Sequence, residues 1–363
     1  MIYLDYQATT PLAPEVKAAM LPWLDQYANP HSPSRKGREA AAAIEYTRSQ
    51  LAAMFPAGGS VVFTSGATEA LNMALRSVRG RIVTLATEHA AVLDTVQWLA
   101  GQGQDVEILP VGSDGLVDLD RLHDALRQPT ALVAAMLVNN EIGVVQPVAD
   151  IARMAHEAGA LMLCDAVQGF GRMAVPEGPD LIAICAHKIH GPKAIGALWR
   201  RDGVMVEPLI HGGGQESGLR SGTLSPMLCA GFGVAAALAG ERRYADHAHI
   251  EGLWRLALAT LGEGWTINGS DTERYRGNLN LRRDGLDTAR LLADCRQVAF
   301  SLGSACASGS GRPSHVLRAL GLSDREARSS IRLGFGRYTT EEEIVSACTL
   351  IRAAVSAQRR FAA

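Results

Sequence analysis

A chain of 363 residues with 47% hydrophobic and 20% charged residues has the composition of a globular protein with one large or two ordinary domains. Its formal net charge of −2 gives no basic surface for nucleic acid and no polybasic patch for a membrane. The start, MIYLDYQATT, lacks the basic region of a signal peptide, and the longest apolar run is shorter than the roughly 20 residues that span a bilayer.

The cysteines are scattered and form no C-x-x-C pair. They lie at positions 164, 185, 229, 295, 306 and 348. This spacing predicts individual thiols in a reducing compartment, so we expect a cytoplasmic protein without a disulfide framework. It also lacks the ligand spacing of a structural zinc site, and we expect no metal.

Short β-branched runs alternate with amphipathic stretches between residues 60 and 200. We expect strands over 61–65, 81–87, 105–111, 130–138, 160–166, 180–186 and 194–200. We expect helices from near Ala67 and over 90–100, 118–127 and 147–159. This alternation, with nearly continuous apolar strands, predicts a doubly wound, mostly parallel sheet that is covered on both faces.

The C-terminal part of the chain is organised differently. A glycine-rich break, HGGGQESGLRSG, covers residues 211–222, and a long helix is expected over roughly 226–262. Shorter mixed α/β structure follows. The last helix begins with a capping box of Thr340 and Glu343. An apolar stripe at helical spacing then predicts its buried face: Ile344, Cys348, Ile351 and Val355.

Three segments at strand ends are more polar than their surroundings. Asp165 follows one apolar strand, Lys188 follows the next, and small residues with Thr68 lie where a strand turns into a helix. Singly, these are an ordinary turn aspartate, a surface lysine and a common turn. Together, at the carboxyl edge of one sheet, they suit pyridoxal phosphate, which needs an anion cradle, an acid for its ring nitrogen and an amine. On chemistry alone, Lys193 competes with Lys188 for the amine's role.

Further polar residues fall at the same predicted edge. His89 follows a strand and could stack on a cofactor ring, although a lone histidine is more often structural. Asn139 and Asn140 follow another strand and are costly to bury unless they bind something. Gln168 lies three residues after Asp165. These segments match neither a P-loop nor a dinucleotide-binding fingerprint.

A second unusual segment is SLGSACASGSGRPSHVL, residues 301–317, which places Cys306 among small polar residues. With YLDYQATTP, VFTSGATEA, TEHAAVLD, VNNEIGVVQ, HKIHGPKAIGAL and HGGGQESGLRSGT in the same order, the chain resembles the cysteine desulfurases of the NifS/IscS type over roughly residues 2–355. The resemblance implies a fold-type-I pyridoxal-phosphate enzyme. Such an enzyme converts L-cysteine to L-alanine and retains the sulfur as a persulfide.

The resemblance also implies roles for individual residues. Lys188 rather than Lys193 forms the Schiff base, and Cys306 is the persulfide-forming nucleophile on a mobile loop. The other cofactor contacts implied are the stacking His89, the ring-nitrogen partner Asp165, the ring-hydroxyl partner Gln168, Asn140, and a phosphate site of Ala67, Thr68, His187 and Thr223. Thr223 would come from the second subunit of a homodimer. Arg332 and Asn140 would hold the substrate carboxylate, with Arg337 as a second candidate.

The chain also departs from the family pattern. Cys185 stands where a phosphate-binding serine is usual, which removes a hydroxyl donor. Four other positions carry an unusual residue: Ser34, Leu302, Arg312 and Gly334. The sequence stops at Ala363, short of the tail with which many family members bind a scaffold protein. The sulfur acceptor, in iron–sulfur cluster assembly or tRNA thiolation, therefore stays open.

We expect a large domain over residues 14–257 and a small α/β domain over 258–363 that carries the Cys306 loop. Residues 1–13 would pack with the small domain, and the active site would lie at the domain and dimer junction. The alternatives are a selenocysteine lyase, another pyridoxal-phosphate enzyme such as an aminotransferase, and a non-catalytic sulfur-relay subunit. Cys306 argues against an aminotransferase, and intact Lys188, Asp165 and His89 argue against a relay.

Overall fold

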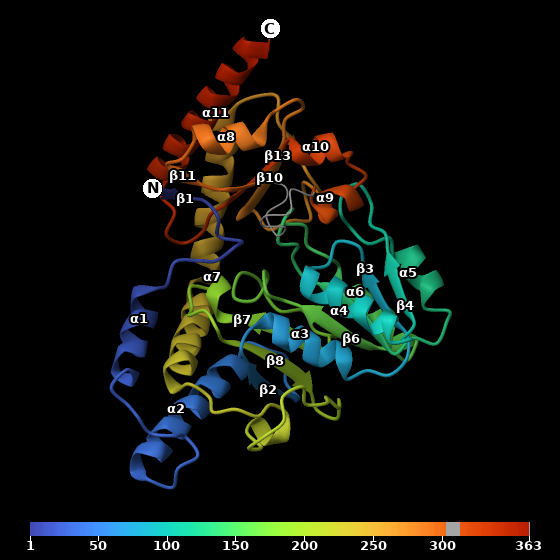
Figure 1. The fold of residues 1–363 in the computed structure, drawn as a ribbon, viewed down its shortest axis with the longest axis vertical. Helices are drawn as coiled ribbons and strands as arrows, with labels where there is room; N and C mark the ends of the chain where they lie inside the picture. Colours follow the sequence, from blue (N-terminus) through green and yellow to red (C-terminus); the bar gives the residue numbers. More distant parts are fainter. Residues whose placement is uncertain (303–312, 363) are drawn as a thin grey trace.

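The structure, a computed structural model, describes residues 1–302 and 313–362 (Figure 1). The chain forms two lobes, and the long helix α7 (Pro226–Leu261) runs from one into the other. The larger lobe contains a seven-stranded sheet and the smaller lobe a four-stranded sheet. Both chain ends lie at the smaller lobe, which is the upper one in Figure 1.

The larger lobe is built on a mixed sheet with the strand order β2–β8–β7–β6–β5–β3–β4. Its strands are β2 (Gly59–Thr64), β3 (Ile82–Leu85), β4 (Val106–Leu109), β5 (Leu132–Met136), β6 (Leu161–Asp165), β7 (Leu181–Cys185) and β8 (Gly196–Arg201). Strand β8 is antiparallel to both of its neighbours, and the pairs among β3 to β7 are all parallel. The predicted doubly wound, mostly parallel sheet is confirmed.

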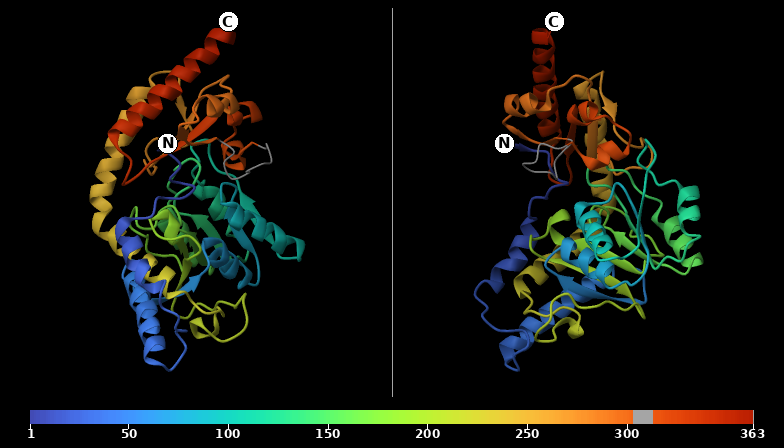
Figure 2. Two further views of the ribbon diagram at one scale, coloured as in Figure 1. Left: turned by 60° about the vertical axis from the view of Figure 1, so that its left-hand side comes forward. Right: turned by 45° about the vertical axis from the view of Figure 1, so that its right-hand side comes forward.

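Helices cover both faces of this sheet, as the two views of Figure 2 show. One face carries α3 (Ala67–Arg76) and α4 (Ala90–Gly101). The other face carries α2 (Arg35–Ala52), α5 (Leu119–Ala125), α6 (Val148–Glu157) and α7. Strand β5 shows why its sequence is continuously apolar: Leu132 and Ala134 pack into one layer, and Val133 and Ala135 pack into the other.

The smaller lobe holds an antiparallel sheet with the order β12–β13–β10–β9. Its strands are β9 (Thr266–Ile267), β10 (Asn278–Arg282), β12 (Ser301–Leu302) and β13 (Ser330–Gly334). Strand β1 (Ile2–Tyr3) of the N-terminal segment pairs in parallel with β11 (Val298–Ala299) of this lobe. The remaining helices are α1 (Pro14–Met20), α8 (Thr288–Asp294), α9 (His315–Ala319), α10 (Asp324–Arg328), α11 (Glu341–Ala362) and the 3-10 helices η1 (Leu21–Trp23), η2 (Ala186–Lys188) and η3 (Glu216–Gly218).

The predicted start of the last helix is confirmed. The Glu343 carboxylate accepts the Thr340 N–H at 3.0 Å, and the Thr340 hydroxyl accepts the Glu343 N–H at 3.2 Å. The predicted apolar stripe is buried. The division into residues 14–257 and 258–363 stays a proposal, because α7 runs through the boundary between them. None of the helices within 1–302 and 313–362 is long and apolar enough to cross a membrane.

Candidate active site

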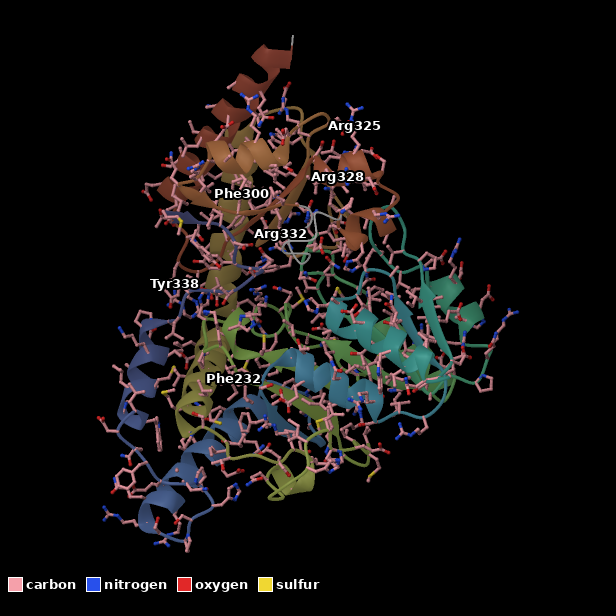
Figure 3. All side chains as sticks on the ribbon, viewed as in Figure 1. Phe232, Phe300, Arg325, Arg328, Arg332 and Tyr338 are labelled. Carbon is pink, nitrogen blue, oxygen red and sulfur yellow. The ribbon has the colours of Figure 1, made fainter. Side chains whose placement is uncertain are left out.

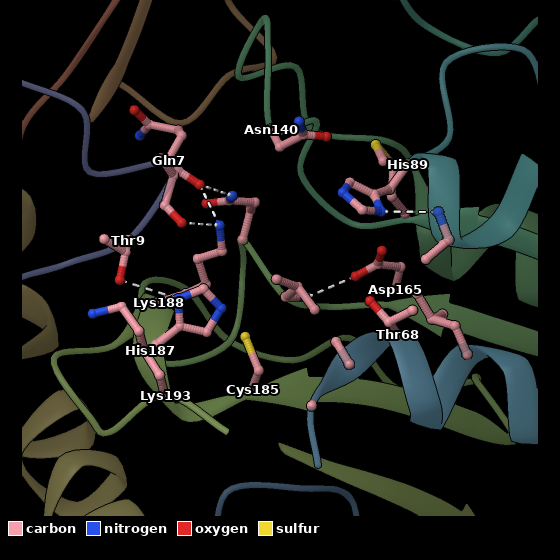
Figure 4. Close-up of a pocket in the computed structure, with 18 of the residues that line it drawn as sticks. Gln7, Thr9, Thr68, His89, Asn140, Asp165, Cys185, His187, Lys188 and Lys193 are labelled. Atoms are coloured by element: carbon pink, nitrogen blue, oxygen red, sulfur yellow. Dashed lines mark hydrogen bonds between the residues drawn. The ribbon is translucent and has the colours of Figure 1, made fainter. Parts of the chain in front are cut away.

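A cavity of about 600 Å³ lies at the carboxyl edge of the large sheet, below the N-terminal segment and the smaller lobe (Figure 4). It brings together most of the residues singled out from the sequence: Ala67, Thr68, His89, Asn140, Asp165, Gln168, Cys185, His187, Lys188, Lys193 and Arg332. Thr223, by contrast, is exposed and does not line this cavity. Cys306 lies outside the described residues.

The turn from β2 into α3 forms one wall of the cavity. Gly66 caps α3 without a side-chain hydrogen bond, and Gly66, Ala67 and Thr68 all line the cavity. A Cβ on Gly196 of the neighbouring strand β8 would come within 2.7 Å of Gly66, so glycine there lets the turn sit close to the sheet. Unpaired N–H groups and the positive helix end make this turn an anion site.

Asp165 is the last residue of β6, and its side chain is buried. One carboxylate oxygen accepts the Val167 N–H at 3.0 Å. Burial raises the pKa of Asp165 above its ordinary value, and the Val167 N–H, His89 and Lys188 oppose that rise. A cationic N–H donor in the cavity would stabilise the charged carboxylate further.

Lys188 ends the short 3-10 helix that follows β7. Its ammonium group donates to the main-chain oxygens of Gln7 and of Ala8, the latter at 2.8 Å (Figure 4). Lys193 also lines the cavity, but from an exposed position. Gln168 donates its side-chain amide to the same Gln7 oxygen at 2.9 Å. The N-terminal segment therefore organises the amine and the amide together.

The region around Lys188 contains two groups that are held neutral. Burial, with the nearby charges of Lys188 and Lys193, lowers the pKa of His187 to about 4. Nδ1 of His187 lies 3.2 Å from the Thr9 hydroxyl. Burial raises the pKa of the Cys185 thiol to about 12. At neutral pH both side chains are uncharged, so His187 does not repel the ammonium group of Lys188 and Cys185 does not neutralise it.

His89 has a structural task in addition to lining the cavity. It is the N-cap of α4, and its Nδ1 accepts the Ala91 N–H at 3.0 Å. Burial lowers the pKa of His89, while Asp165 opposes that shift. A neutral ring whose Nδ1 is an acceptor carries its proton on Nε2. His89 therefore offers a hydrogen-bond donor from Nε2 and keeps Nδ1 for the helix.

The paired asparagines separate into two roles. Asn139 is buried, its amide donates to the Thr87 oxygen at 2.8 Å, and its side-chain oxygen accepts the N–H groups of Glu141 and Ile142 at 2.8 and 3.0 Å. The loop itself therefore meets the cost of burying the Asn139 side chain, and no ligand is needed to satisfy it. Asn140 lines the cavity.

Arg332 comes to the cavity from β13 of the smaller lobe and lies between the lobes in Figure 3. It is only 3% exposed, yet its Nε has no hydrogen-bond partner among the described residues. Nη2 donates to the Asp5 carboxylate at 2.7 Å and to the Ser301 hydroxyl at 3.0 Å, and Nη1 donates to the main-chain oxygen of Asn140 at 2.9 Å. Three of the five N–H groups are thus used, and an acceptor such as a carboxylate could pair with a remaining one.

Arg337, the second candidate for the substrate carboxylate, is engaged elsewhere. Its guanidinium pairs with Asp246 at 2.8 Å, and it lines a separate, smaller cavity. Sequence reasoning also missed Asp5, Gln7 and Ala8. The polar start DYQATT was the signal for them, since no apolar pattern explains it.

Comparisons with known proteins identify the family of this chain. The model of the family described as aminotransferase class-V matches residues 2–346. The chain is 42% identical to the cysteine desulfurase IscS of Rickettsia africae across 96% of this chain and 90% of that protein. It is 41% identical to that of Rickettsia akari across 99% and 92%.

Solved structures give the same result. A crystal structure of a NifS-like protein from Rickettsia africae superposes with a TM-score of 0.91 at 30% identity, covering 98% of this chain and 99% of that chain. A structure of SspA in complex with cysteine superposes with a TM-score of 0.80 at 33% identity, covering 94% and 100%. The fold expected from the resemblance is confirmed. The chain belongs to the cysteine desulfurases of the aminotransferase class-V family.

Proposed function

We propose that this chain is a pyridoxal-phosphate-dependent cysteine desulfurase that converts L-cysteine to L-alanine and passes the sulfur through a persulfide on Cys306 to an acceptor. The observation that carries the proposal is one cavity that combines Lys188, Asp165 and Arg332 in a chain 42% identical to a cysteine desulfurase. An acceptor in iron–sulfur cluster assembly or in tRNA thiolation suits this product.

The residues present fit the cofactor. The cavity of about 600 Å³ has an amine at Lys188, a carboxylate at Asp165 and an anion site at Ala67 and Thr68. Lys188 would hold the aldehyde carbon, and Asp165 would accept the ring N–H. The remaining amide hydrogen of Gln168 suits the ring hydroxyl. When bound, pyridoxal phosphate supplies an electron-accepting ring that withdraws electrons from the substrate's Cα.

Two features concern how the phosphate is held. His187, neutral at pH 7, would donate its one ring N–H to the phosphate and adds no charge of its own. Thr223 is exposed just before α7, so it is free to reach the site of a second copy. We include a homodimer in the proposal on this ground and on the resemblance.

The substrate carboxylate would bind at Arg332. Its guanidinium is fixed by Asp5 and by the Asn140 oxygen, and its Nε is buried without a partner in the described part of the chain. A carboxylate held by a fixed, charged donor is bound in one orientation. The Asn140 side chain lines the same cavity and would contact the cofactor and the carboxylate.

Sulfur transfer requires a nucleophile, and Cys306 is proposed for it on the resemblance, since it lies outside the described residues. The Cys306 thiolate attacks the substrate sulfur, so an S–S bond forms while the substrate Cβ–S bond breaks. The electron pair of the broken bond stays with the carbon, which is protonated and leaves as alanine. His89 presents its Nε2–H to the cavity as a donor during this step.

The test uses the purified full chain supplied with pyridoxal phosphate. Borohydride reduction followed by peptide mapping should place the cofactor on Lys188. K188A should lose this adduct and alanine release from L-cysteine, whereas K193A should keep both. C306S should keep the visible absorption of the bound cofactor and lose the persulfide. An adduct on Lys193, or alanine release by K188A, would refute the assignment of Lys188. Faster turnover of selenocysteine than of cysteine would instead favour a selenocysteine lyase.

A further inference from the structure

The glycine-rich segment 211–222 lies along the free edge of β2, which is an edge strand of the large sheet. Glu216 of this segment accepts the Phe63 N–H at 2.7 Å. Its ion-pair partner Arg48, also at 2.7 Å, donates to the Val61 oxygen at 2.7 Å. This pair satisfies backbone groups that an edge strand would otherwise expose. The segment is therefore fixed to the strand that leads into the anion site.

A second ion pair continues this attachment at the anion site itself. Glu69 lies in the first turn of α3, and one of its oxygens accepts the Ser65 N–H at 2.7 Å. Its other oxygen binds Arg220 of the glycine-rich segment at 2.9 Å. The two side chains are only 11% and 17% exposed, so solvent screens this pair weakly. Ser65 lines the cavity.

The position of Glu69 creates an electrostatic conflict for an anion ligand. A carboxylate in the first turn of a helix is stabilised by the same positive end that would bind a phosphate. Burial raises the pKa of Glu69, but the hydrogen bonds from Arg220 and Ser65 outweigh it and lower that pKa overall. Glu69 is therefore negatively charged at neutral pH, beside a site for a second, larger negative charge.

We propose that Arg220 is a positioning residue that neutralises Glu69 and so allows the turn at Ser65–Thr68 to bind a dianionic phosphate. The inference rests on the proposed pyridoxal-phosphate function. Glu69 fixes the shape of the turn by accepting the Ser65 N–H. Arg220 compensates the negative charge of Glu69, which would otherwise repel the phosphate. The glycine-rich segment thereby contributes to cofactor affinity without touching the cofactor.

The experiment is a double-mutant cycle on the full chain freed of cofactor, with Kd for pyridoxal phosphate read from visible absorption. R220A leaves Glu69 charged and unpaired, and we expect its Kd to rise about tenfold, as for a charge at a partly buried helix end. E69Q removes the charge and keeps an oxygen for the Ser65 N–H, so its Kd should equal that of the original chain or be lower. The double variant R220A/E69Q should return to within about threefold of the original Kd.

Controls separate a charge effect from a loss of packing. Pyridoxal, which lacks the phosphate, should bind R220A as well as it binds the original chain. R79A, which removes an exposed ion pair with Glu207, should change neither Kd. A double variant as weak as R220A, or an E69Q Kd raised tenfold, would overturn the inference, and the E69Q result is available even if R220A does not fold. If the original chain binds no pyridoxal phosphate, the proposed function fails instead.

Discussion

His190 provides a test of how acid acts on this fold. It follows Lys188 by two residues, has a left-handed backbone with φ of 66°, and is 7% exposed. Nδ1 lies 2.9 Å from the Pro11 oxygen, which can only accept, so Nδ1 carries a proton. Tyr6 and Tyr338 each pack on the His190 ring in a T-shaped arrangement, with ring centroids 5.8 and 4.9 Å away. The ring thus joins the N-terminal segment to the turn that carries Lys188.

Burial is the main cause that lowers the pKa of His190 to about 4, and the Pro11 oxygen opposes it. The charges of Arg337 and Arg172 lower this pKa further, and Asp246 raises it. In the unfolded chain the ordinary value is about 6.5, so below that pH the unfolded state binds more protons. The stabilisation is therefore complete above about pH 6.5 and is lost as the pH falls to about 4. The full shift corresponds to about 3 kcal/mol at most.

The assay is urea unfolding of the cofactor-free chain and of H190N between pH 4 and pH 8. Asparagine tolerates the left-handed backbone and can donate its amide to the Pro11 oxygen, but it does not titrate. We expect the free energy of unfolding to fall less steeply with acid in H190N, by up to about 3 kcal/mol over this range. Parallel pH profiles for the two proteins would refute the reasoning, because they would show that His190 binds no extra proton on unfolding.

Two further substitutions test the site against matched variants. H89A should lower the free energy of unfolding by about 1 kcal/mol, because the N-cap of α4 is lost. H89N should not, because asparagine is itself a good N-cap. Equal destabilisation of the two variants in urea unfolding would contradict this. R332Q should raise the KM for L-cysteine at least about tenfold by removing a charged donor, measured by alanine release. R337Q should lower stability and leave KM unchanged, and equal KM effects in both variants would contradict the placement of the substrate.

The larger lobe was predictable because its strands and helices carry local patterns. Each apolar run predicted as a strand between residues 60 and 200 is a strand in the structure. A strand buried on both faces is continuously apolar, so its own sequence is enough to identify it. The antiparallel direction of β8 was not predictable, because pairing direction leaves no mark on a short apolar run. Helix α2, Arg35–Ala52, was missed because its alanine-rich sequence has a weak apolar stripe.

The candidate site was predictable where it follows strand ends and not where it depends on distant contacts. Asp165, His89 and Lys188 each lie at the end of an apolar strand or within a few residues of it, and parallel strands bring such positions to one edge. The pair of Arg332 with Asp5 joins residues 327 positions apart, and no local pattern signals it. Asn139 and Asn140 likewise have similar sequence surroundings. Only the fold determines that the loop satisfies the side chain of Asn139 while Asn140 lines the cavity.

The N-terminal segment explains why the site needs both lobes. Asp5 binds Arg332 of the smaller lobe, while the oxygens of Gln7 and Ala8 bind Lys188 of the larger lobe. Asp5 also forms a bridge to β13, so the segment is fixed to the smaller lobe before it crosses the cavity. A short stretch of chain therefore contacts both cations, one from each lobe, to which we assign the substrate carboxylate and the cofactor. A shift of one lobe against the other would therefore have to break or stretch hydrogen bonds of this segment to Arg332 or to Lys188.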